Sequence, residues 1–130
     1  MTKILPLKSG TAMPVLGFGT SRLTGSVGAE AVRVALEVGY RHVDTADSYG
    51  NHDSVAEGIA QSGVPREEIF LTTKIDGGDH AYKDVLTSFD RYLDELQTDY
   101  VDLLLIHWPS RAVPVGETLK AMQELEEAKT

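Results

Sequence analysis

Cysteine is absent from this 130-residue sequence, which excludes disulfide bonds, thiolate catalysis and cysteine-ligated zinc. Long apolar runs are missing too. The opening MTKILPLKSG lacks the apolar run of a signal peptide, and no segment approaches the roughly 20 apolar residues that cross a membrane. We therefore expect a cytoplasmic protein with no membrane partner.

Positive charge is scarce: 12 Lys and Arg residues stand against 20 Asp and Glu residues, for a formal net charge of -8. Nucleic acids and anionic surfaces attract clustered basic residues and repel an acidic surface, so we expect no nucleic-acid partner. Phosphate-binding motifs are also lacking, because LGFGT at 16–20 has too few glycines for a dinucleotide loop and no GxxxxGK occurs. Small neutral molecules therefore remain possible ligands.

What is present is an ordinary globular composition, with 42% hydrophobic and 25% charged residues. This suits one modest core, and we expect residues 1–130 to form a single domain. A hairpin is expected over 3–20, and strands over 40–46, 69–74 and 100–109. Helical periodicity predicts helices over 28–40, 52–63, 82–98 and 115–130.

Several residues within these segments have expected structural roles. Gly39 is expected to end the first helix, and Asn51 or Asp53 to cap the second. On the third helix, Val85, Phe89, Leu93 and Leu96 form an apolar stripe. On the last helix, Leu119, Met122 and Leu125 are expected to point inward.

The fold class follows from this alternation of strands and helices. Near-continuous apolar runs such as LLLI at 103–106 are typical of parallel strands covered by helices. An α/β fold of this kind is either an open doubly wound sheet or part of a barrel, and the missing phosphate loop disfavours the open sheet. A closed barrel needs about eight strands, whereas about four βα units are expected after the hairpin.

Polar side chains follow three of the predicted strands. The run RHVDTADSYGN provides Asp44 and Tyr49, the next strand ends in Lys74, and the last ends in His107. Ligand sites of parallel α/β folds lie at the carboxyl ends of the strands, so these side chains are expected to lie together.

These residue types suit proton transfer to a carbonyl oxygen. A phenol is a weak acid at neutral pH, but a nearby ammonium favours the phenolate, so Lys74 is expected to activate Tyr49. Asp44 would balance and hold the Lys74 ammonium. His107 could donate a hydrogen bond to the substrate oxygen. Because the set contains no nucleophile, it requires an external hydride donor such as a nicotinamide cofactor.

A metal-dependent hydrolase is a remote alternative. His42 and Asp44 lie two residues apart on one strand, and Asp47, His52 and His107 offer further ligands. Lys74 at the centre would repel a cation, and no HExxH motif occurs, so we expect no metal. His80, in the loop DGGDHAY, could line a substrate mouth, but a solvated loop position is favoured.

The motifs MPVLGFGT, DTADSYGN, IFLTTK and YVDLLLIHWP, in this order, resemble the aldo-keto reductase family. The resemblance runs from about Leu7 to about Glu127. It implies a (β/α)8 barrel that reduces aldehydes or ketones to alcohols with NADPH.

Residue by residue, the resemblance implies specific roles. Tyr49 matches the general acid, Asp44 and Lys74 the pair that tunes it, and His107 the residue that orients the substrate. Trp108 resembles a substrate-pocket residue. Gly19 and Thr20, together with Asp44, resemble contacts to the nicotinamide end of the cofactor.

The chain departs from the family pattern in three places. His52 and Asp53 follow Asn51 where Glu is frequent, and Ser21 stands where many members have Trp. The matching region also corresponds only to the N-terminal half of the barrel, so most of the NADPH site is expected in the second half.

A half-barrel has two exposed sheet edges, so it should seek a partner. We expect a homodimer or pairing with a complementary half-barrel. A non-catalytic half-barrel that self-associates or pairs with such a partner is therefore the main alternative to a reductase.

Overall fold

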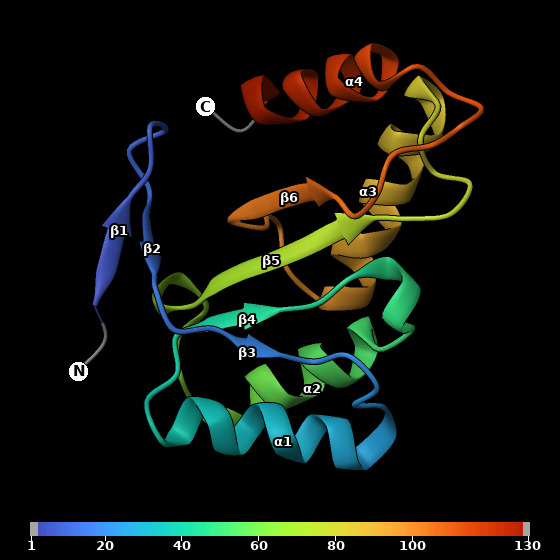
Figure 1. Ribbon diagram of the computed structural model, residues 1–130. Coiled ribbons are helices and arrows are strands. Elements are labelled where there is room, and N and C mark those ends of the chain that lie inside the picture. Colours follow the sequence, from blue (N-terminus) through green and yellow to red (C-terminus); the bar gives the residue numbers. More distant parts are fainter. Residues whose placement is uncertain (1–2, 129–130) are drawn as a thin grey trace.

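The computed structural model describes residues 3–128. Strands β1 (Ile4–Pro6) and β2 (Ala12–Pro14) form an antiparallel hairpin, as the sequence predicted. A parallel sheet follows, in the order β3 (Phe18–Gly19), β4 (His42–Asp44), β5 (Phe70–Ile75) and β6 (Leu103–Ile106). The α-helices are α1 (Gly25–Glu37), α2 (His52–Ser62), α3 (Tyr82–Leu96) and α4 (Val115–Ala128), and the short 3-10 helices are η1 (Asp47–Tyr49) and η2 (Arg66–Glu68) (Figure 1).

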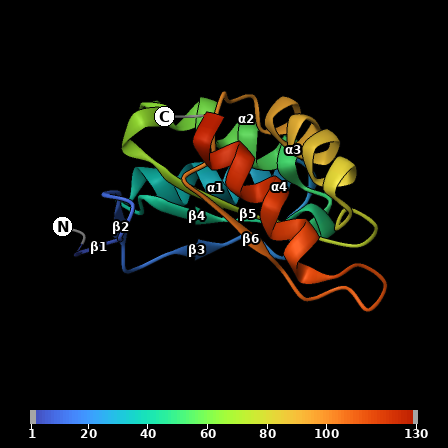
Figure 2. The same cartoon turned by 90° about the horizontal axis from the view of Figure 1, so that it is seen from above.

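The strands of the sheet lie side by side in chain order. A β/α barrel has this sequential order, whereas a doubly wound sheet reverses direction at a switch point. Helices α1, α2 and α3 lie on the same side of the sheet (Figure 2). The β1–β2 hairpin lies near the amino ends of the strands, so it leaves the carboxyl ends open (Figure 1). The expected α/β half-barrel is thus confirmed.

The core between sheet and helices consists of two hydrophobic clusters. One joins α1, represented by Val32 and Leu36, to Val43 of β4 and Leu71 of β5. The other joins α3 to α4 and the end of β5, and Val101 packs against both clusters. Each buried aliphatic or aromatic side chain contributes about 1.5–3 kcal/mol of transfer free energy. This packing holds the strands that carry the polar residues.

The expected helix features are mostly confirmed. Gly39 follows the end of α1 with a φ of 118°, a conformation that an L side chain rarely adopts. The α3 stripe is confirmed, because Val85, Phe89 and Leu96 are buried and Leu93 is partly buried.

On α4, the expected inward position of Leu119 is wrong, because the residue is 50% exposed. Thr118 and Ala121 are buried instead, while Met122 and Leu125 pack against the core as expected. The buried stripe therefore starts one residue earlier, where the Thr118 hydroxyl donates to the His80 carbonyl oxygen.

No helix within residues 3–128 is both long and apolar enough to cross a membrane.

Candidate active site

The carboxyl ends of β4, β5 and β6 meet at one edge of the sheet. The register pairs Asp44 with Thr72, and Lys74 with Leu105. Alternate residues of a strand point to the same face, so Thr72 and Lys74 share one face of β5. Tyr49 ends the short η1 helix that follows β4. Residues from separate parts of the chain therefore converge at this edge.

Lys74 lies at the centre of the group. Its Nζ donates to Asp44 Oδ2 at 2.8 Å and to the Thr45 carbonyl oxygen at 2.9 Å, and lies 3.5 Å from the Tyr49 hydroxyl oxygen. An ammonium has three protons, and three oxygens lie within reach of them. The Lys74 side chain is 11% exposed and that of Asp44 is 33% exposed, so the ammonium is largely shielded from solvent while its carboxylate partner stays partly exposed.

His107 completes the set from the adjacent strand. Its ring packs edge-on against the Tyr49 ring, with 5.8 Å between centroids. Its Nδ1 lies 2.8 Å from Asp76 Oδ1, and its other face stacks on Trp108 at 4.0 Å. Asp44, Tyr49, Lys74 and His107 thus lie together, and Trp108, 57% exposed, lies beside them.

Gly19 and Thr20 lie at the end of β3, next to Asp44 in the sheet. Gly19 is exposed, and a Cβ there would meet no heavy atom within 4 Å. Thr20 is fully buried, and both its backbone N–H and its hydroxyl donate to the Asp44 carbonyl oxygen, at 3.0 and 2.9 Å. The Thr20 side chain therefore braces the strands, while the Gly19 backbone is open to a ligand.

Asn51 has a different role from the expected helix cap. It stands at the cap position of α2, but its side chain makes no capping hydrogen bond. Its Nδ2 donates to the carbonyl oxygens of Thr20 and Leu23 at 2.7 and 2.8 Å, and its Oδ1 accepts from Thr45 Oγ1 at 2.8 Å. Asn51 is fully buried and ties together the loops after β3 and β4. Asp53 lies inside α2 and accepts from the adjacent Ser54 N–H at 2.9 Å, so it is not the cap either.

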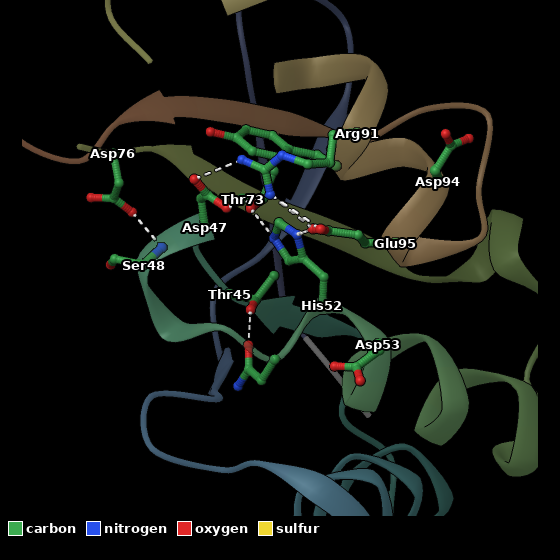
Figure 3. Close-up of polar contacts among 12 residues, drawn as sticks. Thr45, Asp47, Ser48, His52, Asp53, Thr73, Asp76, Arg91, Asp94 and Glu95 are labelled. Carbon is green, nitrogen blue, oxygen red and sulfur yellow. Dashed lines mark hydrogen bonds and ion pairs between the residues drawn. The ribbon is translucent and has the colours of Figure 1, made fainter. Parts of the chain in front are cut away.

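A second polar network lies behind η1 (Figure 3). The buried His52 ring bonds Thr73 Oγ1 through Nε2 at 2.8 Å and Glu95 Oε1 through Nδ1 at 2.9 Å. Arg91 from α3 donates to both carboxylate oxygens of Asp47, at 3.0 and 3.1 Å, and also to Glu95. This network fixes η1, which carries Tyr49, against α3 and β5.

Electrostatics in this second network shift the pKa values of two carboxyl groups in opposite directions. Burial raises the pKa of Asp47, but hydrogen bonds from Arg91 and Asp79 outweigh it and bring the pKa below 3.8. Burial and the hydrogen bond with Asp47 raise the pKa of Asp79 above its usual value. Burial and a hydrogen bond to Asp79 raise the pKa of Tyr92 well above the usual range.

Of the residues considered as ligands of a metal-dependent hydrolase, the structure brings Asp47 and His52 together, beside Glu95. His42 stands at the start of β4 and bonds Thr72 Oγ1 and the Pro14 carbonyl oxygen, whereas His107 follows the end of β6. Within residues 3–128, the group of His and acidic residues with ligand atoms close together is Asp47, His52 and Glu95. The Arg91 guanidinium is bound between these two carboxylates, and its charge opposes a cation.

The structure departs from the sequence-based expectations at two residues of the site. His80 was expected to be solvated, but it is 4% exposed, and its ring bonds the carbonyl oxygens of Gly77 and Trp108. It supports the loop that carries Trp108. Asp76 was missed. Extending the β5–β6 register by one residue places it opposite His107, which is the signal that could have identified it.

Comparison with known proteins identifies the family. The sequence model of the aldo/keto reductase family matches residues 15–128. A 9,11-endoperoxide prostaglandin H2 reductase from Trypanosoma cruzi is 46% identical over 124 residues, which cover 95% of this chain and 44% of that protein. A glycerol 2-dehydrogenase (NADP(+)) from Saccharomyces cerevisiae is 48% identical over 113 residues, which cover 87% of this chain and 36% of the yeast protein.

The fold agrees with the sequence comparison. A crystal structure of an aldo/keto reductase from Brucella melitensis superimposes with a TM-score of 0.93 and 42% identity. The match covers 99% of this chain and 51% of the Brucella chain, so the chain spans about half of these relatives or less. Because the family model matches most of the chain and the motif residues lie at the carboxyl ends of the strands, the chain belongs to the aldo/keto reductase family.

Proposed function

We propose that this chain carries the proton-transfer half of an NADPH-dependent reductase that converts aldehydes or ketones to alcohols. The observation that carries the proposal is the position of Lys74 Nζ, 2.8 Å from Asp44 Oδ2 and 3.5 Å from the Tyr49 hydroxyl. An ammonium in this place stabilises negative charge on the phenol oxygen as its proton leaves.

Each residue has one task in this proposal. Tyr49 donates its proton to the carbonyl oxygen of the substrate. Lys74 stabilises the resulting phenolate, and Asp44 holds the Lys74 ammonium in position. His107 orients the substrate oxygen beside Tyr49, and the exposed Trp108 ring lines the approach.

The residues present fit the reacting end of the cofactor. Gly19 offers an open backbone next to Asp44, on the same edge of the sheet as Tyr49. NADPH, when bound, would supply the hydride that the four side chains lack. The cations Lys74 and Arg91 are already paired with carboxylates, so we assign the phosphate groups of NADPH to no residue of this chain.

The first experiment is a titration of the purified chain with NADPH, followed by the fluorescence of the cofactor, and then an assay of reduction across a panel of aldehydes. Tyr49→Phe is expected to abolish turnover and leave NADPH affinity unchanged. Tyr40→Phe is the matched control, because Tyr40 precedes β4 at the opposite end of the strand. Unchanged turnover in Tyr49→Phe would refute the assigned role.

A second candidate function is association through the open sheet. Within residues 3–128, β3 and β6 each pair with one neighbouring strand, and Leu105 of β6 is 38% exposed. We propose that a second copy or a complementary half-barrel covers these edges. Sedimentation velocity at micromolar concentration is expected to show a dimer, and a compact, stable monomer would contradict self-association.

A further inference from the structure

Asp76 is a buried carboxylate for which the proposed reaction has no role. It follows the last residue of β5, and its side chain is 5% exposed. Oδ1 lies 2.8 Å from His107 Nδ1, and Oδ2 accepts from the Ser48 backbone N–H at 2.9 Å (Figure 3 shows the second contact). A buried carboxylate is costly without such partners, so both contacts define its surroundings.

These two contacts connect separate parts of the site. Ser48 precedes Tyr49 in η1, and His107 follows β6. The His107 backbone N–H also donates to the Ile75 carbonyl oxygen at 3.1 Å, which continues the strand pairing as far as Asp76. A single side chain therefore sets the distance between the turn that carries the phenol and the imidazole ring.

The contact with Asp76 also decides which ring nitrogen of His107 carries a proton. An ionised carboxylate only accepts hydrogen bonds, so Nδ1 must be the donor. Nε2 is then the nitrogen left for the substrate. In the doubly protonated ring, Nε2–H donates to the substrate oxygen while the Asp76 carboxylate balances the charge of the imidazolium.

We propose that Asp76 is a positioning residue that keeps Nδ1 of His107 protonated and anchors the Tyr49-bearing turn through Ser48. The effect on substrate rests on the proposed reductase function. The assignment of the Nδ1 proton does not, because it follows from the contacts of this chain alone.

Asp76→Asn gives a sharp test, since an amide has one acceptor oxygen and one donor nitrogen. The Ser48 N–H can only donate, so the amide oxygen must face Ser48 and the amide nitrogen must face His107 Nδ1. Nδ1 must then lose its proton, and the neutral ring should change from the Nδ1–H to the Nε2–H tautomer. A charge-assisted hydrogen bond favours the wild-type tautomer by at least about tenfold.

The measurement is a long-range proton–nitrogen NMR correlation of the imidazole rings in the full chain, above the pH at which histidines titrate. The chain has four histidines, and a His107→Gln spectrum assigns the signal of interest. Asp102→Asn is the matched control. Asp102 accepts from the Leu71 backbone N–H and from Arg66 near the amino end of β6. Its substitution therefore weakens contacts at that end of the sheet and leaves the contacts of His107 in place.

The expected result is a protonated Nδ1 in wild type and in Asp102→Asn, and an unprotonated Nδ1 in Asp76→Asn. An unprotonated Nδ1 in wild type, or a protonated Nδ1 in Asp76→Asn, overturns the inference. If Asp76→Asn does not fold, the wild-type spectrum alone decides. Where reductase activity is present, kcat/KM of wild type should fall as the pH rises and His107 loses its second proton, whereas Asp76→Asn should lose this dependence because its neutral ring already presents Nε2–H to the substrate oxygen, with unchanged NADPH affinity. An inactive wild type with the expected tautomers would refute the reductase and leave the proton assignment standing.

Discussion

Gly58→Ala should destabilise the fold through the contact between α1 and α2. A Cβ at Gly58 would lie 2.6 Å from the Ala29 carbonyl oxygen and 2.6 Å from Val32 Cβ. Neither atom can move without a shift of α1, because both lie on or next to its backbone. Overpacking of this kind costs about 1–3 kcal/mol. The better helix propensity of alanine offsets about 0.5–1 kcal/mol of it.

Because both 2.6 Å contacts involve atoms fixed to the backbone of α1, we take the upper part of the overpacking range, about 2–3 kcal/mol, and expect the free energy of unfolding to fall by about 1–2.5 kcal/mol, measured by urea unfolding followed by circular dichroism. Gly116→Ala is the matched control on α4, because a Cβ there meets no heavy atom within 4 Å. It should leave stability unchanged or raise it by up to about 1 kcal/mol. If Gly58→Ala is as stable as wild type with the same urea dependence, the close packing of α1 on α2 is wrong.

Two further predictions concern the polar networks around the site. Asn51→Ala removes three hydrogen bonds of a buried side chain and leaves the Thr20 and Leu23 carbonyl oxygens without this donor. Urea unfolding should show that the free energy of unfolding falls by about 2–4 kcal/mol. A fall of less than about 1 kcal/mol would contradict the bracing role. The pKa of Asp47 is lower in the folded chain than its usual 3.8, so its contribution to stability is present above about pH 3.8 and is lost as the pH falls through the folded value. Between about pH 6 and pH 3, wild type should therefore lose more stability than Arg91→Gln, which lacks the guanidinium that lowers this pKa; equal losses in the two proteins would refute the pairing.

Much of the candidate site could be predicted because it depends on short-range pattern. Asp44, Lys74 and His107 each stand at or next to the end of an apolar strand segment, and parallel strands bring such ends to one edge. The structure places these three side chains and Tyr49 together, while their catalytic roles stay predictions. His42, considered as a metal ligand in the remote hydrolase alternative, lies at the start of β4 rather than at its end.

Contacts between distant elements were not predictable in this way. The sequence indicated that Asn51 stands at a helix start, but not that its amide would bond residues that precede α1. His80 appeared to be an ordinary loop residue, yet its burial depends on how the loop after β5 meets Trp108. Leu119 and Thr118 are neighbours on α4, and only the rotation of the helix against the core decided which one is buried.

The sequence by itself determined the order of strands and helices and the ends at which the polar residues stand. These features follow from hydrophobic periodicity and turn residues over a few positions, which are local properties of the chain. Only the tertiary structure decided the pairing of Asp76 with His107 and with Ser48. Those pairs are 31 and 28 residues apart, so they depend on strand register and loop path, which arise from packing of the whole fold.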